Sequence, residues 1–320
     1  MSKVEFAITI GNFDGLHLGH RALIETTLQA SHSFAGKSAL VTFDPHPQEV
    51  LGNRPVERIN SRFHQEQLLK QAGLDEINTL PFTKEFSELS PEGFVRRFLV
   101  EPYNLSQVVV GYDFRFGCQR AGDFKTLETL GKQLGFLVQE VPPLQLGGRT
   151  VSSTLIRQMI RENQFEQLPM YLGRPYGIRG SVEIGDQRGR TLGFPTANIN
   201  PNVNLALNKG VYVSRVCWQG KRFLGVTNFG TRPTFHKDQP LLETHLLDET
   251  IDLYGEIIEV QPLALMISPY KLIIEVQPLA FLRQVVKFSS PDELKSQIFR
   301  DIQQARNYLE RSKLNGETPK

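Results

Sequence analysis

The sequence has 320 residues, of which 40% are hydrophobic and 22% are charged, a composition typical of globular proteins that excludes disordered and collagen-like chains. At roughly 100–200 residues per domain, the length predicts two domains. The 36 basic and 34 acidic residues give a net charge of +2, which argues against a nucleic acid or an anionic membrane as a partner. Any phosphate-binding site must therefore be local.

The cysteines and the amino-terminal segment indicate the cellular compartment of the protein. Cys118 and Cys217 lie far apart and form no CxxC pair, which is typical of a reducing compartment. Glu5 interrupts the first apolar stretch, and no run of about 18 apolar residues follows anywhere. We therefore expect a cytoplasmic protein without an export signal or membrane span.

In the amino-terminal half, short β-branched runs alternate with amphipathic helical patterns. The predicted strands are residues 4–10, 38–43, 107–111 and 136–141. The predicted helices are residues 20–30, 62–72 and 123–134. This βαβ order predicts an α/β domain in which helices cover a parallel sheet.

Beyond Arg174 the pattern changes to strands separated by Gly, Pro and Asn, with no long helix between them. These strands are predicted at residues 176–184, 210–218, 221–227 and 241–248. The pattern predicts a small antiparallel β-barrel. Helical patterning ends near residues 166–174, which predicts domains 1–172 and 173–320.

The chain is predicted to finish with a helix that packs on the barrel. Ser290 is placed as the N-cap, Pro291 as the first helical residue and Glu293 as the third. One apolar stripe follows, made of Leu294, Ile298, Ile302, Ala305 and Leu309.

The sequence IIEVQPLA occurs at residues 257–264 and again at 273–280, an offset of 16 residues. The repeat is too short for a solenoid and is interpreted as a tandem duplication inside one domain. Only one of the two copies can fill a given strand position.

Residues 11–20, GNFDGLHLGH, join the first predicted strand to the first predicted helix. The glycines let backbone N–H groups approach an anion near the positive end of the helix, and His17 and His20 are spaced so that both can face one oxyanion. A P-loop is excluded, because Ser31 stands where the glycine before Gly36 would be needed, and no dinucleotide fingerprint occurs. The spacing alone also fits a glycine turn with two surface histidines.

The segment from His17 to His20 resembles the HxGH signature of nucleotidyltransferases, and residues 11–20 are similar to its flavin-specific form in bacterial bifunctional riboflavin kinase/FMN adenylyltransferases. Residues 42–47, 108–117 and 152–157 match the same family in order. The resemblance implies a Rossmann-like nucleotidyltransferase domain. In it, the FMN phosphate would attack the α-phosphorus of ATP and expel pyrophosphate.

This resemblance also implies roles for single residues. His17 and His20 would be catalytic and would stabilise the transition-state charge together with the loop amides. The ATP-binding residues would be Gly11, Asn12, Phe13, Asp14, Gly15, His17, His20, Ser153, Thr154 and Arg157. Flavin would be bound by Asp44, His46 and Asp113. From the residues alone, a stiff strand exit at 44–47, an Asx cap at Asp113 and a solvated Arg157 stay open.

A second candidate site lies in residues 185–198, GDQRGRTLGFPTAN. Thr196 and Asn198 project to the same side of an extended chain, and their neutral oxygens suit Mg²⁺ that also binds nucleotide phosphates. Alone, the segment also fits a turn rich in Gly, Pro and Asn. It closely resembles the riboflavin kinase motif, which implies that Thr196 and Asn198 bind the metal. The implied ATP-binding residues of the kinase are Gly185, Gly189, Arg190, Pro195, Thr196 and Asn198.

Residues 209–216, 225–235, 243–248 and 252–255 extend this second match. Glu243 is implied as the base that accepts the proton of the ribityl 5′-hydroxyl, although a lone strand glutamate is usually a solvated structural residue. His245, Asp248 and Asp252 are interpreted as structural.

The resemblance implies two reactions, with Mg²⁺ as cofactor and with riboflavin, FMN, FAD and ATP as partners. The carboxy-terminal domain would convert riboflavin and ATP to FMN and ADP, and the amino-terminal domain would convert FMN and ATP to FAD and pyrophosphate. Three alternatives stay open: a nucleotidyltransferase for another phosphorylated substrate, an enzyme with only the adenylyltransferase, and a flavin-binding protein whose kinase is impaired. The oligomeric state stays open as well.

The duplication is the one departure from the family pattern, which runs from D-L-Y-G through a single strand. We predict that residues 273–288 keep this strand, because they lead directly into FLRQVVKF, and that residues 257–272 bulge out as a hairpin or loop.

Overall fold

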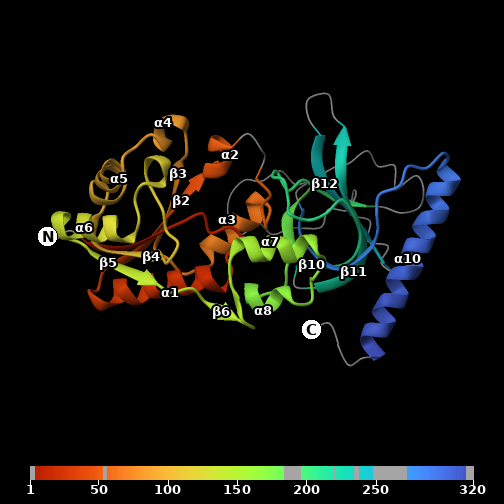
Figure 1. Ribbon diagram of the computed structural model, residues 1–320. Helices are drawn as coiled ribbons and strands as arrows, with labels where there is room; N and C mark the ends of the chain where they lie inside the picture. Colours follow the sequence, from red (N-terminus) through yellow and green to blue (C-terminus); the bar gives the residue numbers. More distant parts are fainter. Residues whose placement is uncertain are drawn as a thin grey trace. The chain divides into compact units, whose positions relative to one another are not determined.

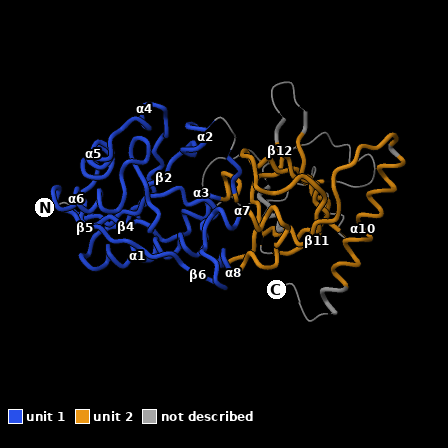
Figure 2. Tube along the Cα trace, in the orientation of Figure 1, with its two compact units in different colours: residues 1–58, 65–156, 170–173 blue, residues 59–64, 157–169, 174–320 orange. Residues whose placement is uncertain are grey.

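The structure is a computed structural model that describes residues 4–52, 56–183, 196–219, 221–233, 238–247 and 272–314. The chain divides into two compact units, which Figure 2 shows in different colours. Unit 1 comprises residues 1–58, 65–156 and 170–173, and unit 2 comprises residues 59–64, 157–169 and 174–320. Each unit is therefore built from several stretches of the chain.

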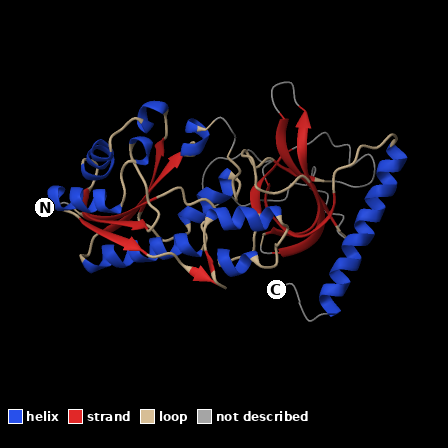
Figure 3. Cartoon of the chain, viewed as in Figure 1, coloured by secondary structure: helices blue, strands red, loops and turns tan. Residues whose placement is uncertain are grey.

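Unit 1 contains a five-stranded parallel sheet with flanking helices (Figures 1 and 3), as the sequence predicts. The strands are β1 (Glu5–Ile10), β2 (Lys37–Asp44), β3 (Glu76–Pro81), β4 (Asn104–Gly111) and β5 (Leu137–Val141), in the order β3-β2-β1-β4-β5. The predicted strands correspond to β1, β2, β4 and β5. The sequence analysis missed β3, because this edge strand buries only Leu80 and shows no apolar alternation.

The three predicted helices of this half are present as α1 (Leu18–Ser33), α3 (Arg62–Lys70) and α6 (Phe124–Leu134). Two short pairs of strand residues, β6 (Gln145–Leu146) and β7 (Arg149–Thr150), form a small hairpin. The other helices before the barrel are α2 (Pro47–Leu51), α4 (Lys84–Ser87), α5 (Pro91–Val95), α7 (Ser153–Arg161) and α8 (Leu168–Leu172), with a π-helical turn at Arg96–Val100 and a 3₁₀ turn at Cys118–Arg120.

The core of unit 1 lies on both faces of the sheet. Ile8 and Ile10 belong to one apolar cluster, whereas Leu40 belongs to another that α1 helps to close through Ile24. Such a division follows from the alternation of side chains along a strand. The second cluster also contains Phe13 and Leu16, which are loop residues. The chain after β1 is therefore anchored in the core by its own side chains.

Unit 2 contains the predicted closed antiparallel barrel, in the strand order β10-β11-β12-β9-β8-β13. Its strands are β8 (Ile178–Glu183), β9 (Ala197–Ile199), β10 (Gly210–Trp218), β11 (Lys221–Pro233), β12 (Asp238–Leu246) and β13 (Leu272–Arg283). The start of β8 is held by residues 59–64. The Asn60 amide donates to the Gly177 carbonyl at 3.0 Å, and His64 Nδ1 lies 3.0 Å from the same oxygen.

The second copy of the repeat forms part of β13, which pairs with β10 and β8 and closes the barrel. The prediction that this copy keeps the strand is therefore confirmed for residues 273–283, but it is wrong for residues 284–288, which lie beyond the end of β13. Leu272 already belongs to β13 rather than to a bulge. The other residues of the predicted bulge, 257–271, include the first copy and lie outside the described residues.

The terminal helix α10 (Pro291–Leu314) begins and packs as predicted. The Ser290 hydroxyl accepts the backbone N–H of Glu293 at 3.2 Å, and the Glu293 carboxylate accepts both the N–H and the hydroxyl of Ser289. The apolar stripe enters a cluster with barrel residues Val213 and Leu224 through Ile298, Ile302, Ala305 and Leu309. At the end of β13, Arg283 forms two hydrogen bonds with the buried Asp301 of α10, at 2.8 and 2.6 Å.

Candidate active sites

The first site lies at the carboxyl edge of the parallel sheet. The strand order reverses between β1 and β4, and ligands of open α/β sheets bind at the carboxyl ends of the strands where this happens. Residues 11–17 follow β1, Asp44 ends β2, and Asp113 follows β4. The Gly11 N–H donates to the Val41 carbonyl at 3.1 Å, which ties the loop to β2. The predicted residues of three segments thus meet at one edge.

The loop after β1 has an unusual backbone. Phe13, Gly15 and Leu16 have φ angles of 50°, 82° and 37°. These values lie in the left-handed region, which residues other than glycine seldom adopt. The Leu16 N–H donates to the Phe13 carbonyl at 3.0 Å, so the loop folds back as a turn. Because Phe13 and Leu16 are buried in the core, their packing offsets part of the conformational strain.

His17 is the N-cap of α1. Its Nδ1 accepts the backbone N–H of His20 at 3.2 Å, so Nδ1 is unprotonated and a neutral ring carries its proton on Nε2. The two imidazoles stack with 3.6 Å between their centroids. A Cβ on Gly19 would lie 3.2 Å from His17 Nδ1 and 3.3 Å from the Val151 carbonyl, which explains the glycine between the histidines.

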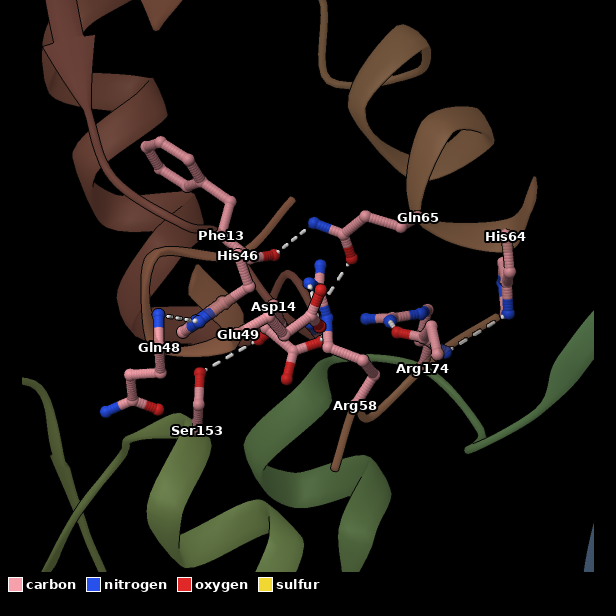
Figure 4. A network of polar contacts seen from close by, with 12 residues as sticks. Phe13, Asp14, His46, Gln48, Glu49, Arg58, His64, Gln65, Ser153 and Arg174 are labelled. Atoms are coloured by element: carbon pink, nitrogen blue, oxygen red, sulfur yellow. Dashed lines mark hydrogen bonds and ion pairs between the residues drawn. The ribbon is translucent and has the colours of Figure 1, made fainter. Parts of the chain in front are cut away.

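Polar contacts from two other segments hold Asp14 (Figure 4). Arg58 Nε lies 3.6 Å from the buried Asp14 carboxylate, and Arg58 Nη1 lies 3.6 Å from Glu49 of α2. The Ser153 hydroxyl, at the start of α7, donates to the Asp14 carbonyl at 2.9 Å. The structure therefore brings the predicted Ser153 to the loop, and Thr154 and Arg157 follow it on the same helix.

The predicted flavin residues differ in their surroundings. His46 is 5% exposed and caps α2, since its Nδ1 accepts the Gln48 N–H at 3.2 Å. Asp113 is exposed beyond β4. Asp44 is half-buried at the end of β2.

Two residues that contact the loop were missed by the sequence analysis, Arg58 and Gln65. Gln65 accepts the Gly15 N–H at 3.3 Å and donates to the Phe13 carbonyl at 2.6 Å. A signal for Gln65 existed, because Leu68 and Leu69 follow it at helical spacing and place it on the buried face of α3. A polar residue on such a face needs partners, and here these are backbone groups of the loop.

The second site lies on one face of the barrel wall. Glu243 on β12 is directly opposite Asn198 on β9 and Asn228 on β11. Directly paired residues of antiparallel strands point to the same face. The Asn228 amide donates to Glu243 Oε2 at 3.2 Å, and the buried Asn198 donates to the Thr196 carbonyl at 3.4 Å. The sequence analysis gave Asn228 no role, because the strand register is not readable from the sequence.

Other predicted residues of this second site cannot be placed. Gly185, Gly189, Arg190 and Pro195 lie outside the described residues, as do Asp248 and Asp252. In the described part of the chain, no group of three or more His, Cys, Asp or Glu side chains could hold a metal ion.

Comparisons with known proteins extend over both units. The family model described as FAD synthetase matches residues 1–155, and the model described as riboflavin kinase matches residues 172–309. A bifunctional riboflavin kinase/FMN adenylyltransferase of Buchnera aphidicola (subsp. Schizaphis graminum) is 36% identical over 95% of this chain and 94% of its own. Relatives of the same name from Escherichia coli and Listeria monocytogenes are 35% and 33% identical, covering 94% and 96% of this chain and 92% and 94% of theirs.

One solved structure, titled as a macrolide-efflux protein from Streptococcus pneumoniae, matches with a TM-score of 0.72 and 27% identity and covers 96% of this chain and 95% of that one. Among the described helices of the present chain, none has the length and apolar character to cross a membrane. The two matched family models lie one after the other along the chain, and the curated relatives named here match it over nearly its full length. The chain belongs to the family of bifunctional riboflavin kinase/FMN adenylyltransferases.

Proposed function

We propose that the loop of residues 11–17 and the start of α1 form the centre of adenylyl transfer. An oxygen of the FMN phosphate would attack the α-phosphorus of ATP, and the bond from that phosphorus to the pyrophosphate would break. ATP would contact the residues named for it above, Gly11, Asn12, Phe13, Asp14, Gly15, His17, His20, Ser153, Thr154 and Arg157, and flavin would contact Asp44, His46 and Asp113.

The hydrogen bonds of the loop suggest how its residues divide this work. Because His17 Nδ1 is an acceptor, its Nε2–H is the group that can donate to a phosphate oxygen in the transition state. The Gly15 N–H already donates to Gln65, so this N–H would shape the loop, and Gly15 would contact ATP through its other atoms. The N–H groups of Leu18 and Gly19, in the first turn of α1, have no acceptor within the helix and suit an anion.

We propose that the face bearing Glu243, Asn198 and Asn228 is the riboflavin kinase site. Glu243 would accept the proton of the ribityl hydroxyl as that oxygen attacks the γ-phosphorus of ATP and ADP leaves. The amide of Asn228 holds the carboxylate at 3.2 Å and would orient it. Gly185, Gly189, Arg190 and Pro195 would contact ATP, although they lie outside the described residues.

Mg²⁺ would be held by Thr196 and Asn198, which offer a hydroxyl and an amide oxygen. The donor set fits, since Mg²⁺ binds few protein ligands and completes its shell with water and nucleotide phosphates. The ion would neutralise charge on the transferred phosphoryl group. The Asn198 amide nitrogen donates to the Thr196 carbonyl, which orients the carboxamide that would supply the ligand oxygen.

The observation that carries the kinase assignment is the register that places Asn198, Asn228 and Glu243 side by side on three adjoining strands. The closed barrel, with the second repeat copy in β13, supports a working kinase rather than an impaired one. We further propose catalytic domains 1–172 and 173–320 and a cytoplasmic location, because Cys118 and Cys217 lie far apart in the sequence and form no CxxC pair.

The purified chain incubated with riboflavin, ATP and Mg²⁺ tests both assignments. Chromatography of the flavins is expected to show FMN and then FAD, and FMN supplied directly tests the second step by itself. Recovery of riboflavin alone would contradict the kinase assignment. Titration with a non-hydrolysable ATP analogue, at saturating flavin and metal, is expected to fill two sites, and a single filled site would contradict the scheme.

A further inference from the structure

The turn at Phe13–Leu16 needs support from outside itself. Two non-glycine residues, Phe13 and Leu16, have left-handed φ angles, a strained conformation that persists only where the surroundings fix it. The side chain of His17, which caps α1, follows this turn directly. The conformation of the turn therefore sets where the histidines of the adenylyl-transfer site lie.

Gln65 supplies that support with one carboxamide (Figure 4). Its Nε2 donates to the Phe13 carbonyl at 2.6 Å, and its Oε1 accepts the Gly15 N–H at 3.3 Å. Both groups belong to the strained turn, on either side of Asp14. Gln65 is 8% exposed, so water does not readily replace either bond.

We propose that Gln65 is a positioning residue for adenylyl transfer, which fixes the turn at Phe13–Leu16 so that His17 and the start of α1 face the nucleotide phosphates. The proposal rests on the proposed function of this loop. Gln65 acts through the loop backbone and has no contact with the reacting atoms. Its effect should thus appear in FAD formation and not in riboflavin phosphorylation.

Gln65→Met keeps the length of the side chain and removes both hydrogen bonds. FAD formation from FMN is expected to fall by about 10- to 100-fold, the usual effect of a displacement near 1 Å at a reacting group. Conversion of riboflavin to FMN in the same preparation should stay within two-fold of the unsubstituted chain. The matched control is Gln71→Met, at an exposed position just beyond α3, which should change neither activity.

Gln65→Glu separates positioning from a general structural role. A protonated glutamic acid offers one donor and one acceptor, the pattern that Gln65 uses, whereas the carboxylate offers no donor to the Phe13 carbonyl. Burial favours the protonated form. FAD formation by Gln65→Glu, divided by that of Gln65→Met, should therefore rise as the pH is lowered. Asp14, Arg58 and His17 face the same turn and are present in both variants, so the ratio cancels their titration.

A Gln65→Met chain that forms FAD within two-fold of the unsubstituted chain overturns the proposal, as does a Glu-to-Met ratio that stays flat with pH. Parallel loss of both activities with a lower melting temperature also overturns it, because that result indicates a structural role alone. Full FAD formation by a His17→Asn chain would instead contradict the proposed function of the loop.

Discussion

The Nδ1 atom of His17 accepts the backbone N–H of His20 at 3.2 Å while the two imidazole rings stack 3.6 Å apart. One side chain therefore serves both as the cap of α1 and as the carrier of an Nε2–H beside the loop. These two roles use different atoms of one ring. Substitutions can separate them.

His17→Asn keeps an oxygen that can accept the N–H at the start of α1, whereas His17→Ala removes both the cap and the donor. We expect both variants to lose FAD formation by at least about 10²-fold, the effect of removing one transition-state donor. Only His17→Ala should also lose stability, by about 1 kcal/mol, the usual value of an N-cap. Flavin chromatography and circular-dichroism melting measure the two effects. Equal stability of both variants would contradict the capping role.

Glu243→Gln tests the catalytic base. The glutamine oxygen can still accept from Asn228, so the barrel should remain folded, but no carboxylate is left to take the proton. Riboflavin phosphorylation is expected to fall by about 10²–10⁴-fold. FAD formation from supplied FMN should be unchanged. Glu310→Gln, at an exposed position of α10, is the matched control and should leave both rates unchanged. A Glu243→Gln chain with normal kinase turnover would rule out this base.

The repeat allows a comparison of one substitution in two identical local sequences. Leu279 of the second copy packs against the cluster of Val213 and Ile302, and its counterpart in the first copy is Leu263. We expect Leu279→Ala to lower the unfolding free energy of unit 2 by about 2–3 kcal/mol. Leu263→Ala should cost less.

Denaturant unfolding followed by the fluorescence of Trp218, the single tryptophan, reports this difference because Trp218 lies on β10 of the barrel. Deleting one copy cannot show which copy fills the strand, because removal of residues 257–272 and removal of residues 265–280 leave the same polypeptide. A larger loss for Leu263→Ala would show that the first copy fills the strand in solution.

Much of the architecture follows from local sequence. The β-branched runs predict β1, β2 and β4 because those strands are buried, and Ser290 with Glu293 predicts the start of α10 because a cap depends on neighbours in the chain. The edge strand β3, in which only Leu80 is buried, has no such pattern.

The residues of the two candidate sites also divide into those that the local sequence indicates and those that depend on tertiary structure. His17 and Glu243 lie in compact motifs, so the sequence indicates them. Gln65 stands 50 residues from Gly15, and Asn228 stands 15 residues from Glu243. Their importance depends on helix packing and strand register, which tertiary structure sets and which one sequence does not reveal.

We expect Asp75 to contribute to the stability of unit 1 against acid. Its carboxylate accepts the Ser38 N–H at 2.8 Å and the Ser38 hydroxyl at 2.7 Å, and these bonds lower the pKa of Asp75 from its ordinary value of 3.8. Because the folded pKa lies below the unfolded one, the stabilisation is fully present above about pH 4. It is lost as the pH falls through the folded pKa.

The unfolding free energy of the unsubstituted chain should therefore exceed that of Asp75→Asn by about 1 kcal/mol near neutral pH. The difference should shrink as the pH falls below about 4, because protonation removes the charged acceptor that the asparagine also lacks. Denaturant unfolding followed by circular dichroism at a series of pH values measures it. Glu76→Gln is the control, since Glu76 forms an exposed ion pair with Lys37 at 3.6 Å, and an exposed pair contributes little to stability. A difference that grows on acidification would show that the sign of this linkage is wrong.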